Sequence, residues 1–204
     1  MSSCPPFAAA VLPREFYGRP SLEVAPELLN KLVVRPDGRA GRIIEVEAYA
    51  GRSDPASHAY RGRTERNATM FGHPGHLYVY FSYGVHWCAN VVTGVEGEAS
   101  AVLLRALHPV AGLPLMRAAR WTTQKRQVDR DLCRGPGRLC QALGIDRSFD
   151  GADLTGGGGA IWLADDGVVP PVTPAASPRV GISSAQDRLW RFSLPDHDGV
   201  SGPR

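Results

Sequence analysis

The residues of this chain best suited to acid–base chemistry beside a flat ligand lie in the stretch IIEVEAY, residues 43–49. There a carboxylate, Glu47, stands two positions from an aromatic ring, Tyr49. Residues i and i+2 of a β-strand point to the same face, so both side chains would share one surface. A carboxylate can activate water while a ring stacks on a heterocycle, and this pairing suits an enzyme that acts on nucleobases. The simpler alternative is a structural ion pair between Glu47 and an arginine such as Arg105.

A second group of candidate residues lies in the aromatic segment LYVYFSYGVHWCANVV, residues 77–92. Its pattern predicts a β-hairpin with Tyr83 near the tip. Tyr80 and Tyr83 are three positions apart, so one could line a pocket while the other projects from the turn. An exposed ring at a hairpin tip would suit a wedge between DNA bases, although packing between strands is the more common role of such rings. Asn90 lies in the middle of a strand, where its amide needs hydrogen-bond partners.

Positive charge is distributed unevenly along the chain. The net charge is only +3, but 21 of the 23 basic residues are arginines, since Lys31 and Lys125 are the only lysines. Residues 61–66 form one basic cluster and residues 117–138 form another. Arginine forks suit phosphate oxygens, so both clusters are candidate contacts to a nucleic-acid backbone. A solvated surface in an arginine-rich chain would explain them equally well.

The cysteines and histidines do not indicate a metal site or a disulfide framework. The chain has four cysteines without a C-x-x-C pair, and the pair His73 and His76 lacks further ligands at zinc spacing. No apolar run approaches the ~18 residues that would span a membrane. We therefore expect a cytoplasmic protein with no metal, no cofactor and no membrane partner, associated with the nucleoid if the source is prokaryotic.

The hydrophobic pattern predicts the elements that would position these residues. Helices are expected over 25–32 and 136–143 and from about Pro114, and strands over 41–49, 99–109, 160–165 and 188–192. A glycine-rich connection over 151–160 and a proline-rich loop over 167–179 separate the later elements. On the strand 41–49, Arg42, Ile44, Val46 and Ala48 would share one face, and Ile43, Glu45, Glu47 and Tyr49 the other. Strands mixed irregularly with helices and joined partly by hairpins predict an α+β fold.

Six longer motifs occur in a fixed order along the chain: IIEVEAYAG, SHAYRGRTERNATMF, PGHLYVYFSYGVHWCANVV, AVLLRALHP, CRGPGRLCQALGI and RVGISSAQDRLWRF. Together they closely resemble the alkyladenine (3-methylpurine) DNA glycosylase family from about residue 14 to 193. We accordingly expect a flexible N-terminal tail over 1–12, a DNA glycosylase domain over 13–195 and a flexible C-terminal tail over 196–204. The chain departs from the family pattern at Glu65, where proline is usual, and at His108, where an acidic residue is common.

The resemblance implies a single α+β domain around a curved antiparallel β-sheet, with surrounding helices and a protruding β-hairpin that enters the DNA minor groove. It assigns catalysis to Glu47, with Arg105 near the catalytic water. The base-binding pocket would contain Tyr49, His58, Tyr80 and Asn90, with Asn90 restricting which purines enter, and Tyr83 would intercalate into the base stack. The DNA backbone would be contacted by Arg61, Arg63, Arg66, Arg120 and Arg134.

The function implied by the resemblance is base excision repair. A monomer would bind double-stranded DNA, flip out an alkylated or deaminated purine and hydrolyse its N-glycosidic bond with a water activated by Glu47. The two lysines lie outside the pocket motifs, so an enzyme without lyase activity is expected. The alternative is a non-catalytic DNA-lesion binding protein on the same scaffold, for which a carboxylate beside phosphates would have no use.

Overall fold

The sheet and helices lie in residues 9–120 and 128–202, which the computed structural model describes. The strands are β1 (Ala10–Val11), β2 (Leu32–Val34), β3 (Ala40–Tyr49), β4 (Leu77–Ser82), β5 (His86–Val92), β6 (Ala101–Ala111), β7 (Trp162–Asp165), β8 (Ala175–Ser177) and β9 (Arg191–Ser193). The α-helices are α1 (Arg14–Tyr17), α2 (Ser21–Leu28), α3 (Leu113–Arg120) and α4 (Pro136–Leu143), and short 3₁₀ helices cover Gly51–Ser53, Ala68–Phe71, Asp129–Asp131 and Arg147–Phe149. These described strands form one antiparallel sheet with the order β1-β7-β2-β3-β6-β5-β4, and β9 lies between β3 and β8.

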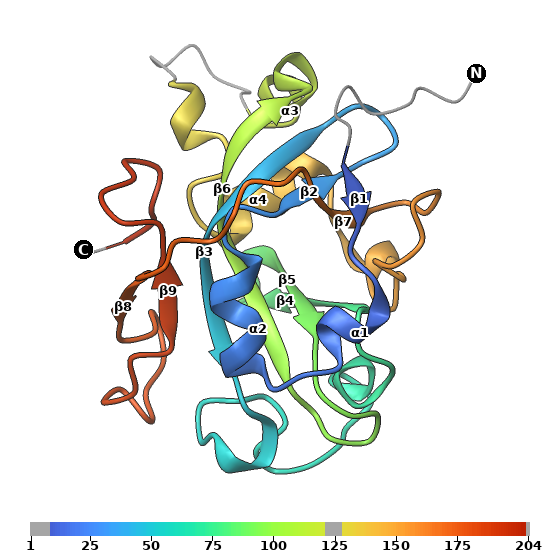
Figure 1. Ribbon diagram of the computed structural model, residues 1–204. Coiled ribbons are helices and arrows are strands. Elements are labelled where there is room, and N and C mark those ends of the chain that lie inside the picture. The colour runs from blue at the N-terminus through green and yellow to red at the C-terminus, as the bar shows by residue number, and fades with distance from the viewer. Residues whose placement is uncertain (1–8, 121–127, 203–204) are drawn as a thin grey trace.

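Strand β3 organises this sheet because it pairs along both of its edges. One edge pairs with β6, while the other pairs first with β2 and then with β9. Register shifts between β3 and β6 interrupt the ladder, and such bulges bend a strand and increase its twist. The result is a curved, open antiparallel sheet with helices beside it, which confirms the predicted α+β fold (Figure 1).

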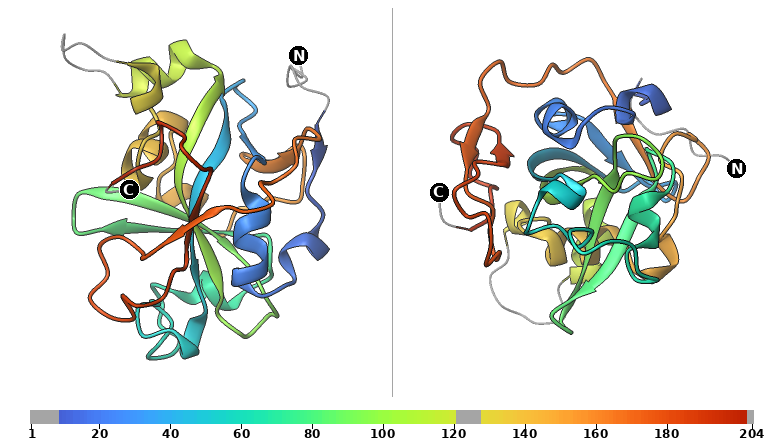
Figure 2. Two further views of the ribbon diagram at one scale, coloured as in Figure 1. Left: turned by 60° about the vertical axis from the view of Figure 1, so that its left-hand side comes forward. Right: turned by 90° about the horizontal axis from the view of Figure 1, so that it is seen from below.

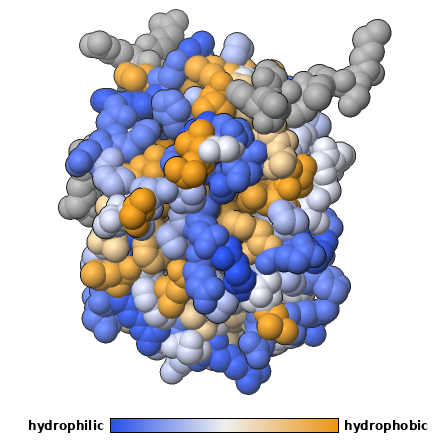
Figure 3. All heavy atoms as spheres, viewed as in Figure 1, coloured by the Kyte–Doolittle hydropathy of each residue, from blue (hydrophilic) through white to orange (hydrophobic). Residues whose placement is uncertain are grey.

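The main hydrophobic core lies between the sheet and its helices. Helix α2 packs against β3 and β6, and α4 packs against β5 and β6. Fully buried side chains from these elements meet in one cluster, which includes Leu28, Val46, Ala48, Leu104 and Leu139. On the face shown in Figure 3, hydrophobic side chains form separate small patches among hydrophilic ones. No helix in the described part of the chain is long and apolar enough to cross a membrane.

A bulge in β3 changes which side chains share a face. Val46 and Ala48, which were predicted to share a face, both enter the core, but Ile43 joins them there, although it was expected on the face of Glu47. Ile44 lies instead against Gly199 of the C-terminal segment. The face assignment of Ile43 and Ile44 was wrong because β3 contains a bulge at this point. The pairing with β6 passes from Ile43↔Leu107 directly to Glu45↔Ala106, so Ile44 is an extra residue that inverts the alternation of side chains between the two faces.

The hairpin β4–β5 extends beyond the rest of the sheet and carries Tyr83 and Gly84 at its tip (Figure 2). Both residues have a left-handed backbone, with φ of 50° at Tyr83 and 67° at Gly84. Two consecutive positive φ values are typical of a type I′ turn, here closed by the Val85 N–H donating to the Ser82 carbonyl at 2.9 Å within the three-residue connection between Ser82 and His86. The turn thus directs a bulky aromatic side chain outward at a position where such a backbone is unusual.

Several element boundaries differ from the predictions. Helix α2 was predicted over 25–32 but begins at Ser21 and contains Pro26 in its interior. It ends at Leu28, because the chain adopts a left-handed backbone two residues later, at Asn30. The helix over 136–143 is confirmed, and Gly144 ends it with φ of 64°. The proline-rich loop contains a strand, β8, which the sequence pattern did not indicate. Its isolated run of alanine and serine carries little strand propensity and pairs only with β9.

Both terminal segments contact the folded domain where the structure describes them. Ala10 and Val11 pair with β7, and Leu12 is buried. At the other end, Ser201 is buried, and its backbone N–H and its hydroxyl both donate to the Glu45 carboxylate, at 2.6 and 3.0 Å. Residues 196–202 therefore satisfy a buried charge on the central strand.

Deleting residues 196–204 should destabilise the protein by roughly 2–4 kcal/mol, because the buried Glu45 carboxylate loses two donors. Urea unfolding of the truncated and full-length chains measures this difference. Asp198→Asn is the control, since it disturbs only an exposed pair with Arg130 and should leave the unfolding midpoint nearly unchanged. Equal midpoints for the truncated and full-length chains would show that the segment does not stabilise Glu45.

Candidate active site

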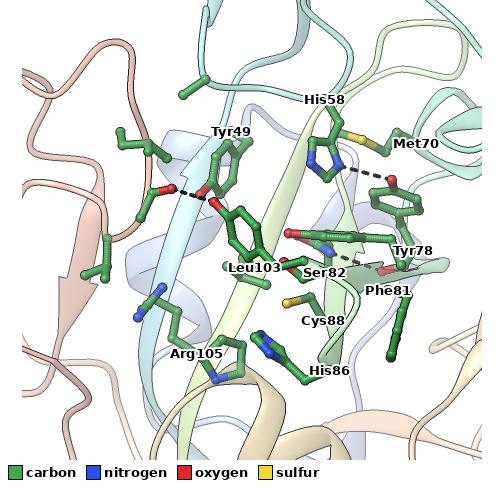
Figure 4. Close-up of a pocket in the computed structure, with 18 of the residues that line it drawn as sticks. Tyr49, His58, Met70, Tyr78, Phe81, Ser82, His86, Cys88, Leu103 and Arg105 are labelled. Carbon is green, nitrogen blue, oxygen red and sulfur yellow. Dashed lines mark hydrogen bonds between the residues drawn. The ribbon is translucent and has the colours of Figure 1, made fainter.

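A cavity of about 750 Å³ opens between the hairpin, the loop that follows β3 and the loop over residues 180–184. The side chains that line it converge from different elements, as the close-up in Figure 4 shows for Tyr49, His58 and Arg105. Seven of the residues singled out from the sequence line this one cavity: Tyr49, His58, Arg66, Tyr80, Tyr83, Asn90 and Arg105. The fold therefore assembles into one site the residues that the sequence places in four separate segments.

The wall formed by the hairpin and the loop after β3 is aromatic. The His58 and Tyr80 rings lie 4.4 Å apart between centroids at 70°, and Tyr78 and Tyr80 stack at 5.4 Å. His58 Nδ1 and the Tyr78 hydroxyl are 3.2 Å apart, which fixes the edge of the imidazole. Tyr78 was not among the residues singled out from the sequence, and its hydroxyl contact to His58 had no sequence signal. The wall offers several ring faces to a flat ligand.

Glu47 is completely buried beside this cavity, and its carboxylate is held by three donors. Its Oε2 accepts from the Tyr49 hydroxyl at 2.8 Å. Its Oε1 accepts from the Val180 backbone N–H at 2.7 Å and lies 3.1 Å from Arg105 Nη1. All three donor residues line the cavity, so the carboxylate is positioned directly behind its wall. A carboxylate has about four acceptor sites, which leaves one of them for a further donor.

Arg105 balances two buried carboxylates at once. Its Nε donates to Glu45 at 2.9 Å, and its Nη2 donates to the Ser201 hydroxyl at 3.1 Å, while Nη1 faces Glu47. Burial lowers the pKa of Arg105, but the Glu47 and Glu45 charges outweigh that effect and raise this pKa above its usual value. Arg191 also donates to Glu45, at 2.7 Å. The ion pair between Glu47 and Arg105, which the sequence offered as the simpler alternative, is therefore present beside the cavity.

The ionisation states of the lining residues follow from their surroundings. Burial, and then the nearby Glu47 charge, raise the pKa of Tyr49, so its hydroxyl remains a proton donor to that carboxylate. Burial raises the pKa of Tyr78 to about 12 and also raises that of Tyr80. Desolvation beside these rings, and then the Arg66 charge, lower the pKa of His58, which keeps the imidazole neutral near pH 7.

Tyr83 and Asn90 mark the mouth and the side of the cavity. The Tyr83 side chain is 84% exposed, and its hydroxyl donates to the Gly181 carbonyl at 3.1 Å, so it reaches across the cavity mouth. Asn90 is buried, and its side-chain nitrogen donates to the Tyr78 carbonyl at 3.2 Å. That bond fixes the orientation of the amide toward the cavity and supplies a hydrogen-bond partner, which the sequence analysis expected for an asparagine in the middle of a strand.

The predicted backbone arginines occupy different surroundings. Arg61 and Arg63 are exposed in the loop after β3, and Arg66 lies at the cavity, where its guanidinium donates to the Phe81 carbonyl at 3.1 Å. Arg120 bonds the side chain of Gln141 on α4 and does not line the cavity, while Arg134 Nε donates to the Val200 carbonyl at 3.0 Å. Arg134 lines a neighbouring groove that shares His86 and Pro136 with the cavity. The part of the second basic cluster over residues 121–127 lies outside the described residues.

The loop over residues 178–184 is the part of the site that sequence reasoning missed. The motif RVGISSAQ contributed to the family resemblance, but none of its residues received a role. Its contribution to Glu47 is a backbone N–H, which any residue other than proline could supply, so residue type could not reveal it. Within the described residues, no group of three or more His, Cys, Asp or Glu side chains could hold a metal ion.

This arrangement, an aromatic cavity beside a buried carboxylate, is typical of enzymes that bind a flat ring. Residues 15–198 match the family described as methylpurine-DNA glycosylase (MPG). A relative from Burkholderia cenocepacia is 56% identical over 197 residues, which cover 97% of this chain and 94% of the relative. A relative from Streptomyces avermitilis is 49% identical, covering 93% of this chain and 90% of the relative. Both relatives carry the provisional name 3-methyladenine DNA glycosylase.

The chain therefore belongs to the methylpurine-DNA glycosylase family, which confirms the resemblance carried by its motifs. A more distant relative from Carboxydothermus hydrogenoformans, 45% identical over 94% of this chain and 98% of its own length, bears the same name. Membership identifies the protein as a hydrolytic DNA glycosylase.

His58 should titrate below the usual histidine pKa of about 6.5, because desolvation and the Arg66 charge both oppose its protonation. NMR titration of the imidazole signals measures this value directly. Since protonation then favours the unfolded chain, the contribution of His58 to stability is complete above pH ~6.5 and falls as the pH drops below it. His58→Gln removes this dependence, and an unchanged pH dependence of unfolding in that variant would contradict the assignment.

Proposed function

We propose that this DNA glycosylase flips alkylated or deaminated purines out of double-stranded DNA and hydrolyses their N-glycosidic bond with a water activated by Glu47. The observation that carries the proposal is the geometry of Glu47, a fully buried carboxylate whose three donors all line one aromatic cavity. The chain would act as a monomer, since one hairpin and one cavity serve one lesion.

The aromatic residues would offset the cost of extruding a nucleotide. Flipping a base costs a few kcal/mol, least where the base is damaged and pairs poorly. Stacking on an aromatic ring returns about 1–3 kcal/mol per base, and Tyr49, His58 and Tyr80 offer such faces in the cavity. The exposed Tyr83 ring at the hairpin tip would fill the space left in the base stack.

Glu47 would act on both the water and the sugar. Cleavage of a glycosidic bond passes through a transition state that resembles an oxocarbenium ion, whose positive charge a nearby carboxylate stabilises. The acceptor site that remains on Glu47 would take a proton from the attacking water, which supplies about 10²–10⁴ in rate. Arg105 and the Val180 amide would hold the carboxylate in place before the reaction, so that little reorganisation is needed. An alkylated purine is already cationic and leaves without a strong general acid.

The distribution of lysines supports water as the nucleophile. A lyase reaction would need an amine that forms a Schiff base at the sugar. Lys31 is buried immediately before β2, where its Nζ lies 2.6 Å from Asp165, and it does not line the cavity. Lys125 lies outside the described residues. We therefore propose a monofunctional enzyme that leaves an abasic site with an intact strand.

Glu47→Gln should reduce single-turnover release of hypoxanthine or N-methylpurines from duplex DNA by at least ~10², while binding to the same duplex is retained, because only the acid–base function is lost. Glu27→Gln, on the surface of α2, is the matched control and should behave as the wild type. The same reactions are analysed for strand cleavage before and after alkali treatment, and the strand should be cleaved only after alkali. Borohydride trapping should yield no covalent complex.

Two results would contradict the proposal. Binding of lesion-containing DNA without base release by the wild type would instead favour a lesion-binding protein on this scaffold. Base release by Glu47→Gln at the wild-type rate would remove Glu47 from the mechanism and leave the glycosylase activity itself intact.

Asn90→Ala should increase release of undamaged guanine relative to hypoxanthine by roughly tenfold. In the wild type, the oriented Asn90 amide beside the cavity would oppose the exocyclic amine that guanine carries and hypoxanthine lacks. Competition between the two bases in one duplex measures this ratio, with hypoxanthine release as the internal control. An unchanged ratio would show that Asn90 does not restrict which purines enter.

A further inference from the structure

A second buried ion pair, formed by Asp54 and Arg179, lies beside the cavity without lining it. Both side chains are completely buried. The contact is bidentate, with Arg179 Nη1 at 2.5 Å from Asp54 Oδ2 and Nη2 at 2.8 Å from Asp54 Oδ1. Neither residue is among those that line the cavity.

Stability alone is a weak reason for such a pair. Removing two charges from water costs several kcal/mol per ion, and a buried pair often contributes no more than apolar side chains of similar volume. The pair does, however, join parts of the chain that are 125 residues apart. A bidentate pair fixes both distance and orientation, so it is suited to holding two segments in register.

On the side of Arg179, the pair fixes a donor to Glu47. Arg179 immediately precedes Val180, whose N–H donates to Glu47 at 2.7 Å. Arg179 Nη1 also donates to the Ala48 carbonyl at 2.9 Å, directly between Glu47 and Tyr49 in the chain. The guanidinium thereby ties the loop that supplies the amide to the strand that supplies the carboxylate.

On the side of Asp54, the pair fixes the loop that follows β3. Asp54 accepts from the backbone N–H of Ala56 at 3.2 Å and of Ala50 at 3.4 Å. Pro55 and Ala56 in this loop line the cavity, and His58 follows two residues later. The carboxylate therefore holds the backbone from which the imidazole projects.

The guanidinium also supports a ring of the cavity wall. The Arg179 guanidinium carbon lies 4.6 Å from the Tyr49 ring centroid and 5.0 Å from that of Trp190. A cation over an aromatic face is attracted by the ring, more strongly when both groups are desolvated. Tyr49 is therefore supported from Arg179 while its hydroxyl contacts Glu47.

We propose that Asp54 and Arg179 are positioning residues for base release: their ion pair holds the Val180 amide on Glu47 and sets the place of the Tyr49 ring. This inference rests on the proposed role of Glu47 and extends it to two residues that do not touch the substrate. A displacement of about 1 Å in a catalytic group can reduce a rate by ~10², so loss of the pair should affect the chemical step.

The test compares Asp54→Asn and Arg179→Lys with the wild type in single-turnover release of hypoxanthine at saturating enzyme, together with affinity for the same duplex. Both variants should lose about 10–100-fold in the release rate, while affinity changes by less than about 3-fold, because the exposed arginines remain in place. Arg179→Met should lose more than Arg179→Lys, since lysine keeps the charge but not the fork.

The matched control is Asp166→Asn. This variant breaks another bidentate pair that involves β3, in which Arg42 Nη1 and Nη2 lie 3.1 and 2.6 Å from the Asp166 carboxylate. Arg42 lies on a part of β3 that does not line the cavity. This variant should keep the wild-type release rate even if its thermal unfolding midpoint falls. If Asp54→Asn does not fold, Arg179→Lys is compared with Asp166→Asn instead. In Arg179→Lys the Asp54 carboxylate remains compensated, because a second cation, Arg188, lies 3.9 Å from it.

Wild-type release rates in folded Asp54→Asn or Arg179→Lys would overturn the inference, as would a loss no larger than that of Asp166→Asn. Glu47→Gln is assayed in parallel, so that failure of the positioning role can be distinguished from failure of the proposed role of Glu47. If Glu47→Gln is inactive and the Asp54 variant is fully active, only the positioning role fails. If Glu47→Gln releases the base at the wild-type rate, the proposed role of Glu47 fails first.

Discussion

Burial of two carboxylates on one strand is the constraint on which the rest of the structure depends. Glu45 and Glu47 are both completely buried, and an unpaired charge in such surroundings would cost several kcal/mol, a large fraction of the net stability of a domain of this size. The compensating groups come from distant parts of the chain: Arg105 from β6, Arg191 from β9, and backbone amides at Val180 and Ser201. The C-terminal third of the chain is thereby tied to the central strand by electrostatics as well as by packing.

This constraint also explains the irregular pairing of β3. A regular ladder would place a β6 residue directly opposite each residue of β3, but the pairing passes from Glu45↔Ala106 to Val46↔Leu104 and leaves Arg105 between two pairs. The bulge allows its guanidinium to contact both carboxylates, whose Oε1 atoms lie 2.9 and 3.1 Å from Arg105 nitrogens. Bulges commonly redirect a side chain at a functional site, and here the redirected side chain compensates the buried charges beside the cavity.

The sequence predicts those parts of the site that depend on local geometry. The shared face of Glu47 and Tyr49 follows from the period of a strand, and the place of Tyr83 follows from the turn chemistry of a hairpin. What it could not predict depends on contacts between distant segments. The bulge at Ile44 has no signature in residue type, the Val180 amide is a backbone group, and the segment that carries Ser201 is polar and rich in glycine, as a loose tail would be. Family motifs identified the residues of the cavity, but the groups that hold them became visible only in the fold.

If a base stacks on Tyr49 as proposed, the dual contact of this residue connects substrate binding with the position of Glu47. The Tyr49 ring lines the cavity, and its hydroxyl donates to the carboxylate at 2.8 Å, so a base that stacks on the ring also restricts the movement of that donor. Because burial and the Glu47 charge raise the pKa of Tyr49, the hydroxyl keeps its proton and cannot compete with the carboxylate as a base. Under the proposed function, a purine stacked on the ring would hold this donor in place, and with it the carboxylate that would activate the water.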